Sequence, residues 1–227
     1  MKALHCLTLA AGAALLPCLA HAFDAAEPLN MVYMAPVAAP TTQRPNGPPV
    51  ADTTAQLARN CALFLGPIED LRSNPGTVGA LMFGIHAPMV VESIRSGDVV
   101  KWTHQALEST RAMGFQPQDG AAPTADTSNQ VGASFGLRLA HAWSAGLNLV
   151  SHVVLQASFQ TPDGPVTRRY HGMGTIGNWN NGNGEYMTVL NAAMANAVQS
   201  FATDAGKLCT DRRAFAPAAA QPVASTN

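Results

Sequence analysis

Three stretches between residues 131 and 174 alternate apolar and polar side chains, and this pattern constrains the fold most strongly. A period of two is typical of strands that bury one face of a sheet. In the first stretch one face carries Val131, Ala133, Phe135, Leu137, Leu139, His141 and Trp143. In the second stretch one face carries Leu149, Val153, Leu155, Ala157 and Phe159. We therefore predict a meander of three antiparallel strands.

The dipeptide Asp163-Gly164 is typical of the tight turn of a β-hairpin. With these two residues as the loop, the predicted cross-strand pairs are Phe159–Arg168, Ala157–Tyr170, Leu155–Gly172 and Val153–Gly174. Gly172 and Gly174 then lie on the apolar face, where the missing side chains let a helix backbone approach closely.

Apolar residues at helical spacing predict two helices. The first runs from about Asp98 to Met113, with Ser96 or Asp98 as its N-cap and Gly114 in the left-handed position after its end. The second runs from about residue 185 to residue 208, and its apolar stripe is rich in small and flexible side chains.

A short apolar strand opens at Cys61 and stops at Gly66-Pro67, and residues 78–94 are expected to be loosely extended. The order strand, helix, three strands, helix predicts an α+β fold. We expect a two-layer sandwich, with a mostly antiparallel four-stranded sheet and two helices on one face.

Residues 1–22 have the features of a signal peptide. Lys2 precedes an apolar run, and Ala20-His21-Ala22 is a small-x-small cleavage signal, so cleavage after Ala22 would release a periplasmic or secreted protein. Residues 23–56 are rich in proline and alanine and are expected to form a linker. Residues 57–210 are expected to form a single α+β domain, and residues 211–227 a disordered tail.

Two cysteines, Cys61 and Cys209, lie outside the signal peptide. In an oxidising compartment they are expected to form one disulfide. A nucleophilic cysteine is disfavoured because Cys209 follows a helix C-terminus, where the helix dipole does not stabilise a thiolate. Lipidation at Cys18 is also disfavoured, because Pro17 precedes it and a better cleavage site follows.

Composition argues against nucleic-acid binding and against a transmembrane anchor. Charged residues make up 12% of the chain and the net charge is −1, so no basic stripe suits nucleic acid. After the signal peptide there is no apolar run of transmembrane length, so we expect no transmembrane anchor in the mature chain.

We predict no catalytic residue, metal site or cofactor, and therefore no enzyme. His152 and His171 are expected on the polar face of neighbouring strands, about four residues out of step, with His141 on the opposite face. Three imidazoles without a carboxylate or thiolate make a poor metal site. Ser134, Ser151 and Ser158 do not lie in the strand–turn–helix elbow that a nucleophilic serine requires.

Two helices on one face leave the other face of the sheet open. Its residues include Arg138, His152, Gln156, Arg169 and His171. This mixture suits docking of an envelope protein or of a second copy of the chain, and a plain solvent-facing sheet is the alternative. A second candidate contact is Trp179, the aromatic residue in the Asn/Gly-rich loop 177–184.

The chain resembles the YajG-type lipoproteins of Gram-negative envelopes over about residues 63–205. The similar features are the acid-Arg ending of the opening strand (Ile68–Arg72), a helix closing on Ala112-Met113-Gly114-Phe115, the Thr167–Tyr170 strand and a long Ala-rich final helix. The resemblance implies a non-catalytic accessory or partner-binding protein of the envelope. The alternative is a small secreted enzyme or carbohydrate-binding protein that uses loop 177–184.

Overall fold

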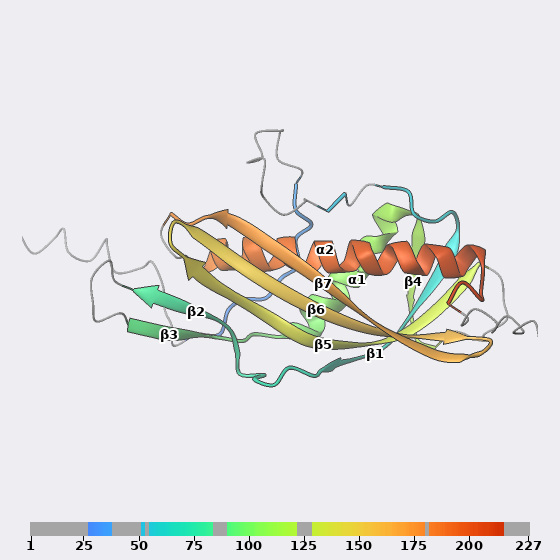
Figure 1. Cartoon of the computed structure of the whole chain (residues 1–227), viewed down its shortest axis with the longest axis horizontal. Helices are drawn as coiled ribbons and strands as arrows, with labels where there is room; N and C mark the ends of the chain where they lie inside the picture. Colours follow the sequence, from blue (N-terminus) through green and yellow to red (C-terminus); the bar gives the residue numbers. More distant parts are fainter. Residues whose placement is uncertain are drawn as a thin grey trace, which may run out of the picture.

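The computed structural model describes residues 27–37, 51–52, 55–83, 90–121, 129–179 and 182–215. Strands and helices follow one another as an α+β chain (Figure 1), which confirms the predicted class. The strands are β1 (Cys61–Asp70), β2 (Thr77–Phe83), β3 (Val90–Arg95), β4 (Phe115–Asp119), β5 (Gln130–Ala145), β6 (Asn148–Thr161) and β7 (Gly164–Gly177). The helices are α1 (Val99–Glu108), its 3₁₀ continuation η2 (Ser109–Met113) and α2 (Asn183–Thr210).

All of these strands join one mixed seven-stranded sheet, so the prediction of four mostly antiparallel strands is wrong. Strands β5, β6 and β7 form the expected antiparallel meander. Strand β1 runs parallel to the first half of β5 and also to β4. Strand β2 runs parallel to the second half of β5 and antiparallel to β3. Thus β1 and β2 follow one another along the same edge of the long strand β5.

The unexpected strands lack a strong local pattern. Residues 78–94, expected to be loosely extended, contribute β2 and β3, which pair with each other as a hairpin. In β4, Phe115 is buried whereas its neighbour Gln116 and the last two residues are exposed. Strand β4 also contains Pro117, which an edge strand tolerates because one side of its backbone needs no partner.

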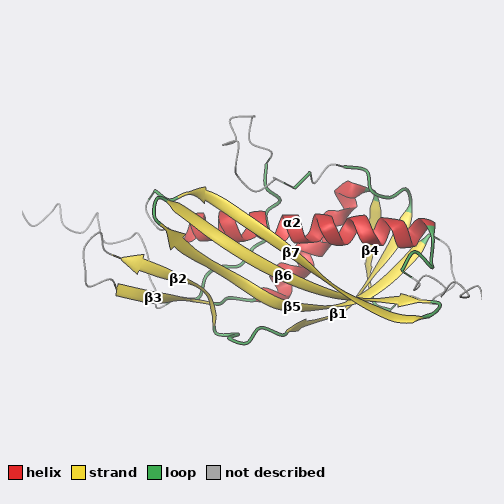
Figure 2. Ribbon diagram, in the orientation of Figure 1, coloured by secondary structure: helices red, strands yellow, loops and turns green. Residues whose placement is uncertain are grey.

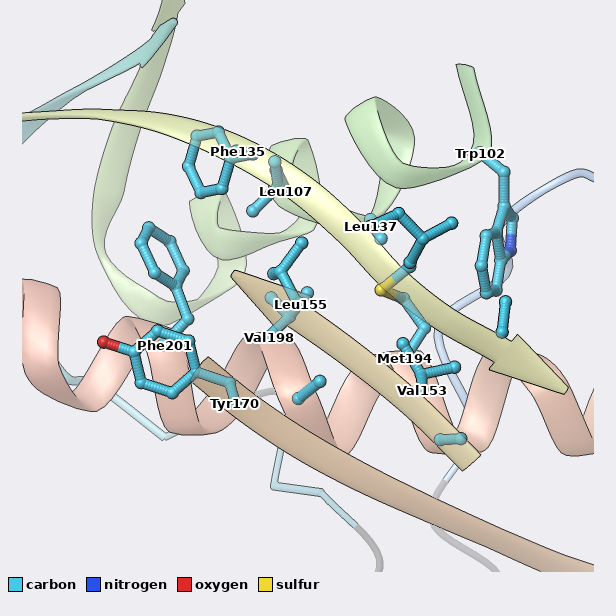
Figure 3. Close-up of a cluster of buried hydrophobic side chains, with 14 of the residues drawn as sticks. Trp102, Leu107, Phe135, Leu137, Val153, Leu155, Tyr170, Met194, Val198 and Phe201 are labelled. Atoms are coloured by element: carbon cyan, nitrogen blue, oxygen red, sulfur yellow. The ribbon is translucent and has the colours of Figure 1, made fainter. Parts of the chain in front are cut away.

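Both helices pack on the same side of the sheet, as predicted (Figure 2). Asp98 caps α1 by accepting a hydrogen bond from the Lys101 amide at 2.9 Å, and Gly114 takes the left-handed conformation after η2. The indole Nε1 of Trp102 on α1 donates to Oδ1 of Asn191 on α2 at 2.8 Å. Figure 3 shows side chains of both helices and of β5, β6 and β7 meeting in one apolar core.

A β-bulge divides β5. In the second half of the strand, the side chains therefore lie on the faces opposite to those predicted. Leu137 pairs with Leu155 and Leu139 pairs with Val154, so Arg138 is the extra residue. Beyond it the buried positions are Ala140, Ala142 and Ser144, whereas Leu139, His141 and Trp143 point away from the helices. Small residues suit the inner side there because Trp102 of α1 lies beneath the end of β5 (Figure 3).

The hairpin between β6 and β7 has a register two residues away from the predicted one. Thr161 pairs with Gly164, so Pro162 and Asp163 form the loop. Leu155 therefore pairs with Tyr170 and Val153 with Gly172. Because the error is an even number of residues, each side chain keeps its predicted face, and both β7 glycines still lie under α2.

Parts of the predicted linker and tail pack on the domain. In the stretch expected to be a linker, Leu29 and Met31 are 2% and 4% exposed and belong to the core. After α2, Arg212 donates to the backbone oxygens of Gln130 and Gln160, and Phe215 packs against the core. The predicted cleavage site and Cys18 lie outside the described residues. In the part of the chain that the structure describes, no helix is both long and apolar enough to span a bilayer.

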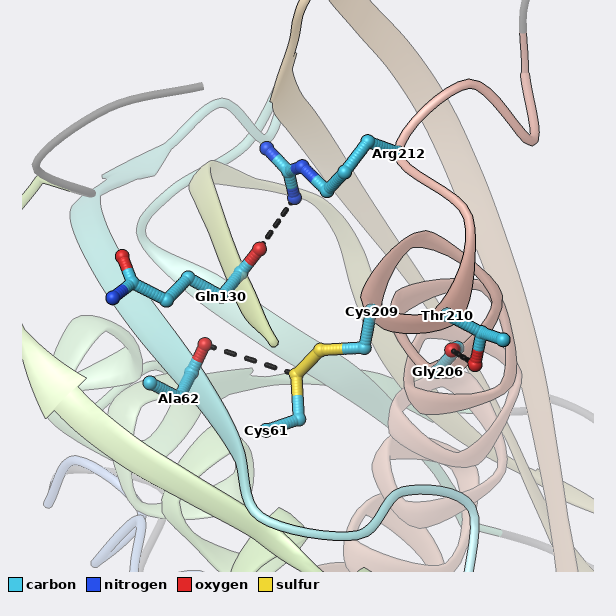
Figure 4. Close-up of a disulfide and its surroundings, with 7 residues drawn as sticks. All are labelled: Cys61, Ala62, Gln130, Gly206, Cys209, Thr210 and Arg212. Atoms are coloured by element: carbon cyan, nitrogen blue, oxygen red, sulfur yellow. Dashed lines mark hydrogen bonds between the residues drawn. A yellow bond between two sulfur atoms is a disulfide. The ribbon is translucent and has the colours of Figure 1, made fainter. Parts of the chain in front are cut away.

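Cys61 at the start of β1 and Cys209 near the end of α2 form a disulfide (Figure 4). Their Cα atoms are 6.2 Å apart, within the range that a disulfide spans. The bond joins the sheet to the end of the longest helix, as the sequence predicted.

Candidate functional site

The side of the sheet away from α1 and α2 remains accessible to solvent in the described chain. We call the outward side chains of β5, β6 and β7 the open face. Its main members are Arg138, Leu139, His141, Trp143, His152, Val154, Gln156, Ser158, Thr167, Arg169, His171 and Met173. All five side chains that were predicted from the sequence to bind a partner lie on the open face.

Polar side chains at one end of the open face are fixed by hydrogen bonds between strands. Nε of Arg138 donates to Oε1 of Gln156 at 3.1 Å, and Arg169 is the register partner of Gln156 on the next strand. The Ser158 and Thr167 hydroxyl groups bond to each other at 2.7 Å. Two arginines, one from each side of β6, therefore flank Gln156.

Four rings form a row at the other end of the open face. His141 lies 5.7 Å from Trp143, Trp143 stacks on His152 at 5.2 Å, and His152 lies 4.8 Å from His171, measured between ring centroids. Nδ1 of His152 and Nε2 of His171 are hydrogen-bonded at 2.6 Å. We call these four residues the ring row.

The ring row corrects three expectations from the sequence. His152 and His171 are in direct contact, because the shifted register leaves them only one diagonal step apart. His141 is on the same face as both, because the β5 bulge reverses the strand's facing before it. Trp143, expected on the buried face, reaches the open face for the same reason.

The surroundings of His141 and His152 favour neutral imidazoles. Burial, followed by the nearby His171 and His141, lowers the pKa of His152, and burial lowers the pKa of His141. A short N–H···N hydrogen bond between two imidazoles also requires that one nitrogen carry no proton. Within the described ranges, no three His, Cys, Asp or Glu side chains are arranged to hold a metal ion.

The strands that form the open face carry positively charged side chains but no negatively charged ones. β5, β6 and β7 contain Arg138, Arg168 and Arg169 but no aspartate or glutamate. Arg168 points to the helix side, where it contacts the Asp204 carboxylate at 3.4 Å and stacks over Phe215. The open face is therefore supplied with two arginines and no carboxylate from its own strands.

The indole of Trp179, the second predicted contact, is 91% exposed between β7 and α2. The Glu185 carboxylate accepts hydrogen bonds from the backbone N–H groups of Trp179 at 2.9 Å and Gly182 at 3.2 Å. The Asn178 backbone N–H donates to the Leu147 carbonyl oxygen at 2.9 Å. The loop is thus joined to the β5–β6 turn, while Asn180 and Asn181 lie outside the described residues.

Two hollows lie away from the Trp179 loop. One, about 780 Å³, is lined by α1, the end of β4 and the part of β1 between Leu65 and Ile68, where its register with β5 shifts. His104 lies at its side with Nε2 2.7 Å from the Asp119 carboxylate. The other, about 380 Å³, borders the open face between Leu71 and Ser158. No sequence pattern indicated the His104–Asp119 pair, because its members come from elements that only the fold brings together.

Two of the three serines considered as nucleophiles, Ser151 and Ser158, have structural hydrogen bonds. Ser151 is buried and its hydroxyl donates to the Val189 carbonyl oxygen at 2.6 Å, which holds β6 to α2. Ser158 bonds to Thr167, as described above. Ser134 lies beside the smaller hollow.

Comparisons with known proteins assign no family. No family model and no curated protein matches the chain. A solved structure of a DUF330 protein from Xanthomonas campestris superposes with a TM-score of 0.46 at 7% identity, covering 72% of this chain and 96% of that one. A second structure, described as an uncharacterized protein, superposes with a TM-score of 0.35 at 12% identity, covering 69% and 94%.

Proposed function

We propose that this protein is an exported, non-catalytic component of the cell envelope that binds another protein through the open face. The observation that carries the proposal is the ring row beside two arginines, on a face that neither described helix covers. Aromatic residues and arginine are enriched in the residues that dominate protein–protein affinity. The hydrogen bonds between strands hold these groups in place before binding, which lowers the entropic cost of association.

An envelope location is supported by two independent features. The first 22 residues have the pattern of a signal peptide, and the Cys61–Cys209 disulfide suits an oxidising compartment. The pattern-level resemblance to YajG-type lipoproteins favours an accessory role over catalysis. A periplasmic or secreted protein without lipid at Cys18 is the form we propose.

Charge favours a different protein over a second copy as the partner. Two open faces placed against each other would bring their arginines together without any carboxylate from these strands. Like charges across an interface oppose association, whereas an acidic partner surface would complement the two arginines. We therefore propose an envelope protein with acidic residues in its binding surface.

Photo-crosslinking in cells tests this proposal. A photoreactive phenylalanine at His171 probes the open face, and the same residue at Ser200, exposed on α2, is the matched control. We expect one defined protein adduct from position 171 and none from position 200. The double change Arg138→Glu and Arg169→Glu should abolish the adduct, whereas Arg111→Glu on η2 should leave it unchanged.

Three results would contradict the proposal. They are the absence of any adduct at position 171, equal adducts at both positions, and an adduct that survives reversal of both arginines. An adduct with the mass of two copies of this chain would contradict the choice of partner.

A further inference from the structure

Two large apolar side chains project into solvent at the same end of the sheet. Leu147, in the β5–β6 turn, is 84% exposed, and Trp179 after β7 is 91% exposed. The hydrogen bond from Asn178 to the Leu147 carbonyl oxygen joins the two loops. We call Leu147 and Trp179 the apolar tip.

The backbone beneath the apolar tip is held in place although its side chains are free of packing. Ala145 pairs with Asn148, so Gly146 and Leu147 form a two-residue turn, and Gly146 has the positive φ of 64° that such a turn requires. On the other loop, the Asn178 side chain donates to the Ser144 hydroxyl at 3.1 Å. The fold therefore presents these two side chains outward in a defined position.

The two loops that form the tip contain no charged side chain of their own. The described residues of the two loops are glycine, leucine, asparagine and tryptophan. The closest carboxylate along the chain, that of Glu185, accepts hydrogen bonds from two backbone N–H groups of the Trp179 loop. Transfer of the tip into a less polar medium would thus desolvate no ionised side chain of these loops.

The small area of the tip favours a lipid surface over a protein. A fully exposed tryptophan offers up to about 250 Å². Two side chains are therefore well below the roughly 800 Å² per partner of a stable protein interface. A bilayer needs no complementary surface, and tryptophan is the residue enriched at its water interface.

We propose that Leu147 and Trp179 insert into the interfacial region of a lipid membrane. The rest of the molecule stays in water, with the open face still accessible, so this inference is independent of the proposed protein partner. The contact is reversible, because two side chains give far less apolar area than a transmembrane segment.

Vesicle partitioning tests the proposal with the purified protein. Vesicles of phosphatidylethanolamine and phosphatidylglycerol are the probe, and phosphatidylcholine vesicles measure the contribution of lipid charge. The double change Leu147→Ser and Trp179→Ser should weaken partitioning about tenfold or more. Met34→Ser is the matched control, because Met34 is 70% exposed in the N-terminal segment but is outside the tip.

Tryptophan quenching gives a second readout that does not depend on the double variant. In a Trp143→Phe protein the remaining tryptophans are the buried Trp102 and the exposed Trp179. Brominated lipid should quench the exposed one on vesicle binding. Absence of partitioning, equal partitioning of the double variant, or absence of quenching would overturn the proposal. Dimerisation that the double change removes would also overturn it, by making the tip a contact between copies.

Discussion

Arg72 is 7% exposed and is surrounded by acceptors from three segments. Its Nε and Nη2 atoms each donate to the Asp70 carboxylate at 2.8 Å, and its Nη1 donates to the Thr77 carbonyl oxygen at 2.8 Å. Further bonds reach the Pro75 carbonyl oxygen and the Ser96 hydroxyl. This one side chain therefore organises the connection through which the chain leaves β1 and begins β2 along the same edge of β5.

The Asp70–Arg72 ion pair should make the free energy of unfolding depend on pH in the acidic range. The Arg72 hydrogen bonds lower the pKa of Asp70 and outweigh the opposing effect of burial. A carboxylate with a lowered folded pKa stabilises the fold above its unfolded pKa, and this contribution is lost as the pH falls through the folded value. Asp70→Asn should cost about 2 kcal/mol of unfolding free energy at neutral pH.

Chemical denaturation at several pH values measures this effect. The difference between wild type and Asp70→Asn should shrink below about pH 4, where the carboxyl of the unfolded chain becomes protonated. Glu69→Gln, at the exposed neighbouring position, serves as the control and should change stability little. A loss that is constant across the whole pH range would contradict the assigned role of the ion pair.

At the scale of elements, the contact between α2 and β7 depends on two glycines. A Cβ atom at Gly172 would lie 1.9 Å from the Ala193 carbonyl oxygen, and one at Gly174 would lie 2.3 Å from that of Val189. These are backbone atoms of a helix and cannot rotate away. The helix therefore packs closer to β7 than a strand with side chains at these positions would allow.

Gly172→Ala should destabilise the protein by about 2–3 kcal/mol, because it overpacks the helix–sheet contact. Gly177→Ala on the same strand is the matched control, since its Cβ would meet the Trp179 indole nitrogen at an ordinary 3.5 Å. Denaturant midpoints of the two variants measure the difference. Equal midpoints would show that α2 does not lie as close to β7 as described.

At the scale of the whole molecule, the disulfide joins two positions 148 residues apart. It closes nearly the entire domain into one loop, from the start of the first strand to the end of the last helix. Such a link reduces the conformational entropy of the unfolded chain, and the effect grows with loop length.

Changing both Cys61 and Cys209 to serine should lower the free energy of unfolding by about 4–5 kcal/mol. Thermal or denaturant unfolding measures the loss. Reductant should destabilise wild type by a similar amount and leave the double variant unaffected, which separates loss of the bond from loss of packing. Two titratable thiols in protein isolated under oxidising conditions would refute the bond itself.

Local patterns were sufficient to predict much of the fold. The alternation in β6 and the helical stripes of α1 and α2 are properties of neighbouring residues, and the structure confirms these elements. The disulfide followed from cysteine count and compartment alone. The small residues of β7 also indicated correctly where a helix would approach, because an even register error preserves the face of every side chain.

Only tertiary packing decided which side chains meet on the open face. β5 bulges at Arg138, and Trp102, which lies beneath the end of β5, comes from a helix that precedes β5 in the chain. Likewise, β2, β3 and β4 gain their backbone hydrogen bonds from partners that no local pattern identifies. The sequence by itself therefore determined the periodic elements and their buried stripes. The ring row required tertiary structure, because a single extra residue in β5 reverses which face each later side chain occupies. The mixed sheet required it too, because β1 and β2 find their places along β5 through contacts between residues far apart in the chain.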